Sequence, residues 1–373
     1  MNPWVVWALL AEPGDELAGL LRLTLGADKS LSAVMAENPV QGLVRLIDGV
    51  GYLDAARERF GKLEQTLADG VERYRARWHA EALNSAVKAT RIAGASVVTP
   101  DEPTWPSGLS ELGLAMPSAL WFRGDLSQLE GSVAMVGSRS ATNYGAWVCA
   151  EFVGALAEKG VATVSGGAFG IDAHTHRAAI SIGAPTYAVM AGGIDRLYPS
   201  AHSEWLREIS VIAELPPGNR PTRWRFLQRN RLIAALSNST VVVEAGWRSG
   251  AINTANHALG LGRPLGAVPG QITSASSGGT NKLIADGKAA LIGSAEQLLE
   301  LAGVRTATEE QEIAGLGSLD LRVLDALTSR AQNIAALAVR ANATEFETAM
   351  ALASLELLGR AERDSGDSWR KTR

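Results

Sequence analysis

The feature that most constrains the fold is a series of short apolar runs that alternates with helical stretches after about residue 131. The runs are VAMV, VATV, TYAVM, SVIAEL, TVVVEA, PLGAVP and AALIG, beginning at residues 133, 161, 186, 210, 240, 264 and 289. They are four to six residues long and mostly lack polar alternation. Such strands are typically buried on both faces of a parallel sheet, with helices as crossovers. The sequence therefore predicts an α/β fold with a doubly wound, mostly parallel, Rossmann-like sheet.

Helical patterns flank this region on both sides and predict further domains. The predicted parts are a helical domain (1–95), the sheet domain (96–303), a linker (304–318) and a C-terminal domain (319–373). The sheet domain opens with a proline-punctuated connector, 97–120. In the C-terminal domain three helical patterns precede a hairpin with a glycine turn, an order that predicts a winged helix. Thr344 and Glu347 have the spacing of a capping box at the start of its third helix.

Composition and charge are those of an ordinary globular protein. The 373 residues are 46% hydrophobic and 20% charged, and the formal net charge is −4, so any basic surface must be local. The apolar opening PWVVWALLAEPGDE is too short to span a bilayer and lacks a basic start, which indicates a cytoplasmic protein without membrane association. The single cysteine, Cys149, excludes an internal disulfide, and its helical flanks favour a buried thiol.

The loops that follow the apolar runs are the first place to search for a ligand site. Ligands of open α/β sheets bind outside the carboxyl ends of the strands. Here those ends continue as VGSRSATNYG, VSGGAFGID, VMAGGID, VEAGWRSGA and VPGQ, in which glycines allow close approach to the backbone and helix N-termini attract phosphate. The candidate phosphate-binding residues are Gly137, Ser138, Arg139, Ser165, Gly166 and Gly167. Tight turns alone would also explain each glycine taken singly.

A local basic surface lies in RPTRWRFLQRNR, residues 220–231, which contains five arginines and no acid. Single-stranded nucleic acid needs cations along its phosphates and aromatic faces for its unstacked bases. The phosphate-binding candidates are Arg225, Arg229, Asn230 and Arg231, and the base-stacking candidates are Trp224 and Phe226. We expect residues 229–231 to lie at the N-terminal end of the apolar helix that follows. The alternative is a solvated loop whose aromatic residues cover the edge of the domain.

Other chemistries find little support in the sequence. SGGAFG lacks the spacing of a dinucleotide loop and VATV ends without an acid for a ribose, so no nicotinamide cofactor is expected. His174 and His176 alternate on a predicted helix and point to different faces, so no metal site is expected. Ser165, Asp172 and His174 do not make a hydrolytic triad on spacing alone, and Asp172 is expected to order the loop.

A set of ordered motifs carries a family resemblance. GSRSATNYG, SGGAFGID, AGGIDRLYP, RNRLIAALS, VVVEAGWRSGA, GRPLGAVPG and SGGTNKLI resemble, in this order, the DNA-processing protein A (DprA/Smf) family over about residues 100–295. The resemblance implies phosphate-binding positions at 137–139, at 165–167, and at Arg229 with its neighbours. It also implies a SAM/HhH-like N-terminal domain and a C-terminal winged helix. Leu227 departs from the family, which usually has proline after the phenylalanine.

The resemblance implies a function that needs no cofactor and no catalytic residue. The expected protein is a homodimer that binds single-stranded DNA, protects incoming strands during natural transformation and loads the RecA recombinase onto them. One alternative is a nucleotide-processing hydrolase similar to the lysine-decarboxylase-like phosphoribohydrolases, whose P-G-G-x-G-T-x-x-E motif has no matching acid here because Glu244 precedes its loop. A second alternative is a scaffold for protein partners, which the acidic net charge favours and the converging loops disfavour.

The third helical pattern of the C-terminal domain, EFETAMALASLELL, contains glutamates and no basic residue. A helix that reads duplex DNA presents Arg, Lys, Asn or Gln to the base edges. We therefore expect this helix to serve as a contact module and not to read duplex sequence.

Overall fold

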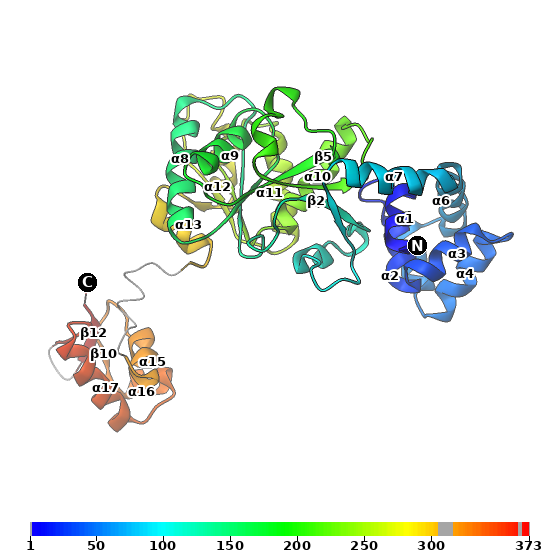
Figure 1. The fold of residues 1–373 in the computed structure, drawn as a ribbon. Helices are drawn as coiled ribbons and strands as arrows, with labels where there is room; N and C mark the ends of the chain where they lie inside the picture. The colour runs from blue at the N-terminus through cyan, green and yellow to red at the C-terminus, as the bar shows by residue number, and fades with distance from the viewer. Residues whose placement is uncertain (1, 305–315, 365–367, 373) are drawn as a thin grey trace. The chain divides into compact units, whose positions relative to one another are not determined.

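The computed structural model of the chain describes residues 2–304, 316–364 and 368–372. Its contacts divide the chain into two compact units, 1–304 and 305–373. The first unit contains the N-terminal helices and a large sheet, and the described residues of the second form three helices and a small sheet (Figure 1). The further division of the first unit at about residue 95 stays a prediction.

The N-terminal part of the first unit is helical. Its helices are α1 (Pro3–Leu10), α2 (Glu16–Leu25), α3 (Ala27–Met35), α4 (Pro39–Gly49), α5 (Leu53–Phe60), α6 (Leu63–Arg77) and α7 (Ala80–Ile92). Asp15 caps α2 by accepting a hydrogen bond from the Ala18 N–H, and its carboxylate also accepts one from the Tyr74 hydroxyl. The Tyr74 ring meets the buried Trp7 ring edge to face at 5.2 Å between centroids. These contacts join α1, α2 and α6 around one apolar core.

The large sheet confirms the predicted fold class. Its strands are β1 (Ser96–Val98), β2 (Leu120–Arg123), β3 (Val133–Val136), β4 (Thr163–Ser165), β5 (Thr186–Gly193), β6 (Ser210–Leu215), β7 (Ser239–Val242), β8 (Leu265–Ala267) and β9 (Ala290–Leu291). Their spatial order is β1-β2-β6-β5-β4-β3-β7-β8-β9. The pairs from β6 through β9 are parallel, as the unbroken apolar runs predict.

The connector 97–120 contributes residues to two strands of the sheet. It begins within β1 and ends at the start of β2, and these two strands extend the sheet with antiparallel pairs at the β6 edge. Between them the chain forms the 3₁₀ helix η1 (Ser107–Ala115). The strands are only three and four residues long and have prolines between them, so they are too short to show a strand pattern in the sequence.

Helices cover both faces of the sheet (Figure 1). They are α8 (Asn143–Glu158), α9 (Ile171–Ser181), α10 (Arg223–Ala235), α11 (Gly250–Gly260), α12 (Gly278–Ala285) and α13 (Ala295–Leu301), with short 3₁₀ turns η2 (Ser200–His202) and η3 (Trp205–Arg207). Val133 and Met135 pack with α8, α9 and α13, whereas Ala134 and Val136 pack with α10, α11 and α12. This alternation along β3 makes the sheet doubly wound.

The N-terminal helices pack directly on the sheet region. The buried Arg22 of α2 donates from Nη2 to the Met116 carbonyl at 2.8 Å, and burial lowers its pKa to about 10. A Cβ at Gly19 would lie 1.8 Å from the Leu114 carbonyl oxygen, so only glycine allows α2 this close to η1. The two parts thus share a tight interface within the first unit.

The second unit is small and described in part. It contains α15 (Ser318–Ala326), α16 (Ile334–Ala341), α17 (Glu345–Leu357), β10 (Gln332–Asn333), β11 (Ala361–Asp364) and β12 (Ser368–Lys371), with the antiparallel order β10-β12-β11. The predicted capping box at Thr344 and Glu347 is confirmed. The predicted glycine turn at 365–367 lies outside the described residues, and the assignment as a winged helix stays a prediction.

The helix α17 corresponds to the segment without basic residues. Phe346 and Met350 lie on its solvent side with exposed side chains, and so does Leu357. The exposed side chains of this helix are therefore apolar or acidic, with Glu345, Glu347 and Glu356 among them, where a groove-reading helix would be basic. In the part of the chain that the structure describes, no helix is both long enough and apolar enough to cross a membrane.

Candidate functional site

A cavity of about 840 Å³ opens where the carboxyl ends of β3 and β7 lie side by side. From β3 the chain continues into α8 on one face of the sheet, whereas from β7 it continues into α11 on the other face. The two loops diverge and leave a crevice, which is where ligands of doubly wound sheets bind. The lining comes mainly from segments 136–140, 221–233 and 246–254, with Ala168, Asp172 and Tyr198.

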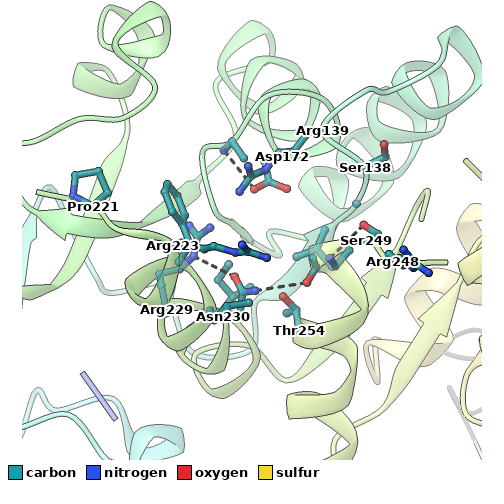
Figure 2. Close-up of a pocket in the computed structure, with 18 of the residues that line it drawn as sticks. Ser138, Arg139, Asp172, Pro221, Arg223, Arg229, Asn230, Arg248, Ser249 and Thr254 are labelled. Carbon is teal, nitrogen blue, oxygen red and sulfur yellow. Dashed lines mark hydrogen bonds between the residues drawn. The ribbon is translucent and has the colours of Figure 1, made fainter. Parts of the chain in front are cut away.

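Three arginines with exposed side chains line this cavity. They are Arg139 of the β3 loop, Arg223 at the first residue of α10 and Arg248 of the β7 loop. None of them forms an ion pair with another residue that the structure describes. Figure 2 shows Arg223 and Arg248 at opposite sides of the cavity and Arg139 at the top of the view. Unpaired guanidinium groups around one opening favour phosphate oxygens as ligands.

The β3 loop is held rigidly beneath Arg139. A Cβ at Gly137 would lie 2.4 Å from Ile171 Cγ1, so the position requires glycine. The Ser138 N–H donates to the Glu244 carbonyl at 2.7 Å, and Ser138 Oγ accepts from the Ser140 N–H at 3.1 Å. The predicted residues Gly137, Ser138 and Arg139 all line the cavity, and their phosphate binding stays a prediction.

Arg229 also lines the cavity, but its guanidinium is buried. Its Nη1 donates to the Gly166 carbonyl at 2.6 Å and to the Val189 carbonyl. Burial lowers its pKa to about 10, against the attraction of the nearby Asp172 carboxylate. Burial raises the pKa of the Asp172 carboxyl, because it disfavours the charged form, whereas Arg229 and hydrogen bonds from residues 165, 166 and 168 oppose the rise. Arg229 therefore holds the β4 loop in place at the cavity.

Phe226 forms the aromatic wall of the cavity. The guanidinium carbons of Arg139 and Arg229 lie 5.4 Å and 5.8 Å from its ring centroid, and the Tyr198 ring meets it edge to face at 5.6 Å. Asn230, next on α10, donates from Nδ2 to Asn253 Oδ1 at 3.1 Å and so joins α10 to α11. The predicted residues Phe226 and Asn230 thus lie at the cavity, with Phe226 already in contact with other side chains.

The three predicted residues of the β4 loop lie beneath the cavity and do not line it. Ser165 is buried, and its hydroxyl donates to the Met135 carbonyl at 2.6 Å. The Gly166 carbonyl accepts from Arg229, and the Gly167 carbonyl oxygen lies 3.0 Å from His202 Nδ1. In the structure this loop supports the site, and its direct binding of phosphate stays a prediction.

Two predicted arginines of α10 point away from the cavity. Arg225 forms a two-pronged ion pair with Glu12, with both N–O distances at 2.9 Å, and lowers the pKa of that carboxyl. Arg231 is almost fully buried and pairs with Glu214 at 2.7 and 2.8 Å. Both guanidinium groups therefore already have carboxylate partners. Trp224 is 56% exposed and lies outside the cavity lining.

The helix α10 begins earlier than the sequence suggests, which corrects the expected position of residues 229–231. It starts at Arg223, where Thr222 Oγ1 accepts from the Arg225 N–H at 3.3 Å as an N-cap. Residues 229–231 thus lie in the middle of a helix and not at its N-terminal end. Leu227 has the N–H that a proline would lack, and this residue allows the helix to run through the whole basic segment.

Arg223 and Arg248 were not among the predicted site residues, nor were Ser249 and Thr254. A signal for Arg248 was present, since VEAGWRSGA follows an apolar run and precedes a helix. Ser249 caps α11 by accepting from the Ala251 N–H at 3.3 Å. The β7 loop therefore brings a second cation to the edge of the same cavity.

The buried Glu244 occupies the N-terminus of α8. Its carboxylate accepts from the Thr142 N–H at 2.9 Å and from the Thr142 hydroxyl. A Cβ at Gly145 would lie 2.5 Å from Glu244 Oε2, so the carboxylate fits against the first turn of the helix. A negative charge at this place repels a phosphate there. The position that holds the pyrophosphate in dinucleotide-binding sheets is therefore taken by a side chain.

The histidines near the β4 loop serve packing. His176 is buried, its Nδ1 lies 2.8 Å from Thr186 Oγ1, and burial lowers its pKa to about 3. Among the residues that the structure describes, no group of three or more His, Cys, Asp or Glu is placed to hold a metal ion. Cys149 is buried as predicted, and burial raises the pKa of its thiol to about 12.

Comparison with known proteins points to one family. The family model for DNA recombination-mediator protein A matches residues 96–303. The putative DNA processing protein DprA of Mycobacterium tuberculosis is 38% identical over 366 residues, which is 90% of this chain and 92% of that protein. The DNA processing protein DprA of Streptococcus pneumoniae is 38% identical over 200 residues, which is 52% of this chain and 70% of that protein.

Solved structures agree with this match. The crystal structure of DNA processing protein A from Streptococcus pneumoniae superposes with a TM-score of 0.63 and 27% identity, covering 80% of this chain and 98% of that one. A structure that describes the single-stranded DNA binding mode of the Helicobacter pylori protein superposes with a TM-score of 0.50 and 27% identity, covering 55% and 94%.

Proposed function

This chain belongs to the DNA recombination-mediator protein A family, and from that premise we propose that it binds single-stranded DNA in the cavity at the carboxyl edge of its sheet. The Helicobacter pylori relative is known from a structure of its single-stranded DNA binding mode. In this chain the strand's phosphates would bind to the exposed guanidinium groups around the cavity.

The arrangement of Arg139, Arg223 and Arg248 carries the proposal. The three side chains come from separate segments, surround one cavity of about 840 Å³ and have no carboxylate partner among the described residues. Like charges gathered around one opening repel each other, and a phosphate backbone relieves that repulsion. The formal net charge of the whole chain is −4, which disfavours adventitious binding of DNA away from this local basic surface.

We further propose that the cavity has no catalytic role. A hydrolase of the alternative family would need a carboxylate aimed at its nucleotide. Glu244 lies against Thr142 instead, and Asp172 is buried beside Arg229. Asp172 lines the cavity, but its carboxylate accepts a hydrogen bond from the Ala168 N–H at 3.3 Å, so both carboxylates already have structural partners, which supports a binding protein over an enzyme.

The finer parts of the role follow from the family alone. We propose that the chain acts as a homodimer that protects incoming single strands and delivers them to a RecA-type recombinase during natural transformation. The name of the family, recombination mediator, supports the delivery step. The tests of these two parts concern the whole molecule and are given in the Discussion.

The binding proposal is tested by fluorescence anisotropy with a labelled single strand and its duplex over a series of salt concentrations. We expect the wild type to prefer the single strand, and Arg139→Ala and Arg248→Ala each to weaken binding by about tenfold. Each substitution should also lower the slope of log affinity against log salt by about 0.7, because one phosphate contact is lost.

Arg91→Ala is the matched control, since Arg91 is exposed on α7 and makes no ion pair with a described residue. We expect it to leave both the affinity and the salt slope unchanged. Equal losses in all three variants would show that only total charge matters and would contradict a defined site. A folded wild type without affinity for the single strand would refute the proposed function itself.

A further inference from the structure

An exposed tryptophan stands directly outside the candidate site. Trp247 precedes Arg248 in the β7 loop, is 69% exposed and does not belong to the cavity lining. Its neighbour Arg248 does line the cavity. A large aromatic face in solvent is unfavourable unless something covers it, and here it lies one residue from a cation aimed at the cavity.

One face of the indole ring lies against the backbone. A Cβ at Gly278 would lie 2.5 Å from Trp247 Nε1, 2.8 Å from Cε2 and 3.1 Å from Cδ1, so the pyrrole part of one ring face packs on the backbone at the start of α12. The same backbone is tied to the β7 loop by a hydrogen bond of 2.7 Å from the Gly279 N–H to the Ala245 carbonyl. Because one face is backed in this way and the side chain is 69% exposed, Trp247 offers its other face to solvent.

The opposite side of the cavity has a similar pair. Trp224 is 56% exposed, lies outside the lining and follows Arg223, which does line the cavity. Figure 2 shows Arg223 and Arg248 on opposite sides of the cavity. Each side therefore has one arginine at the cavity and one exposed tryptophan adjacent to it in the chain.

We propose that Trp247 stacks with a base of the strand whose phosphates bind in the cavity, on the side opposite Trp224. This inference rests on the proposed function. A strand that crosses the cavity would have its phosphates near Arg223, Arg139 and Arg248. Its bases would then meet the surface next to the cavity, where the exposed tryptophans lie. Stacking on an aromatic face is available to every base and stabilises single-strand binding without selecting sequence.

The test separates base stacking from phosphate binding by means of abasic DNA. Two labelled single strands of equal length are compared, one with all bases and one with abasic sites along the central segment, so that the phosphates are the same. We expect the wild type to bind the abasic strand about tenfold more weakly per stacked base. In Trp247→Ala this penalty should fall severalfold, whereas Trp247→Phe, which keeps an aromatic face, should retain most of it.

Trp147→Ala is the matched control, because Trp147 is 61% exposed on α8 and does not line the cavity. It should keep the full abasic penalty. An unchanged penalty in Trp247→Ala, or equal weakening on both strands, would overturn the inference while leaving the proposed function intact. The inference would also be overturned if Trp247→Ala changed the oligomeric state and kept the abasic penalty, because Trp247 would then contact another protein chain and not a base. Lack of wild-type binding to either strand would instead refute the proposed function.

Discussion

At the residue scale, two arginines at one cavity have different roles because of their burial. Arg139 is exposed and, among the described residues, its guanidinium stacks on Phe226 without a carboxylate partner, whereas Arg229 is buried and donates to two backbone carbonyls. A guanidinium that is already bonded and desolvated gains less from a phosphate than a solvated, unpaired one. The motif residue with the strongest structural role is therefore not the one best placed to bind.

A pH effect follows from His176, which lies under the β4 loop. Its pKa falls from the ordinary value of 6.5 to about 3 on folding, because burial disfavours the charged ring. The unfolded chain therefore binds a proton below pH 6.5 that the folded chain does not, and stability falls as the pH falls. Between pH 7.5 and 5.0 we expect this residue to account for about 2 kcal/mol of lost unfolding free energy.

The measurement is urea unfolding at both pH values for wild type, His176→Leu and His174→Gln. His176→Leu should reduce the difference between the two pH values by about 2 kcal/mol, whatever its effect on stability at pH 7.5. His174→Gln, a change on the same helix, should keep the wild-type difference. If His176→Leu also keeps it, the buried ring does not control the acid sensitivity.

At the scale of the element, α10 shows how one helix divides its residues between two tasks. Arg223, Phe226, Asn230 and Ile233 face the cavity, at spacings of three and four residues. The other side of the helix carries the ion pairs with Glu12 and Glu214. The helix thus anchors the N-terminal helices on one side and forms a cavity wall on the other.

The pair between Arg225 and Glu12 allows a direct test of this division. Both side chains are less than one-third exposed and joined by two charge-assisted hydrogen bonds. We expect Arg225→Ala to lower the unfolding free energy by about 1 kcal/mol and to change single-strand affinity less than threefold. A double-mutant cycle with Glu12→Gln should show a coupling of the same order.

The matched variant is Arg139→Ala, which should show the opposite pattern, with lower affinity and unchanged stability. A large loss of affinity in Arg225→Ala with unchanged stability would return Arg225 to the binding surface that the sequence suggests.

The sequence predicts this helix only in part. The residues of the basic segment were found by composition, because five arginines without an acid stand out in an acidic chain. Which of them face the cavity depends on where the helix begins, and the N-cap Thr222 sets that start at Arg223. Once the helix start at Arg223 is known, the three- and four-residue spacing places Arg223 on the cavity face and Arg225 and Arg231 on other faces of the helix.

At the scale of the whole molecule, the parallel sheet could be predicted because β3, β4, β5, β7 and β8 are buried along their whole length, and the polar residues in them carry only small or aromatic hydroxyl side chains. The strands β1 and β2 could not, since two short segments separated by prolines lack a pattern of their own; β2 is held by pairing with β6, and β1 by pairing with β2. The cavity followed from the order of the strands, because β3 and β7 are neighbours and their crossovers diverge. Arg248 lies at this cavity because β7 pairs with β3, and the local sequence around Arg248 does not reveal that pairing.

The proposed homodimer and its delivery of DNA also belong to this scale. Sedimentation velocity should show a species of twice the chain mass, and recombinase filaments should assemble faster on a protected single strand when the wild type is present. Arg139→Ala should sediment as the wild type does and lose the acceleration, because delivery requires the strand to be held. A monomeric wild type, or acceleration that persists in Arg139→Ala, would contradict the mediator role proposed here.

The three arginines of the cavity come from separate segments of the chain, so the proposed binding of a strand requires the folded sheet that brings them together. A chain in which β7 has not yet joined β3 has Arg139 and Arg248 apart and cannot hold a strand at both. If the proposed site binds only in the finished sheet, a bound strand would stabilise the folded state by mass action, by about 2.7 kcal/mol at a hundredfold excess over Kd. On that proposal, DNA binding would also favour folding.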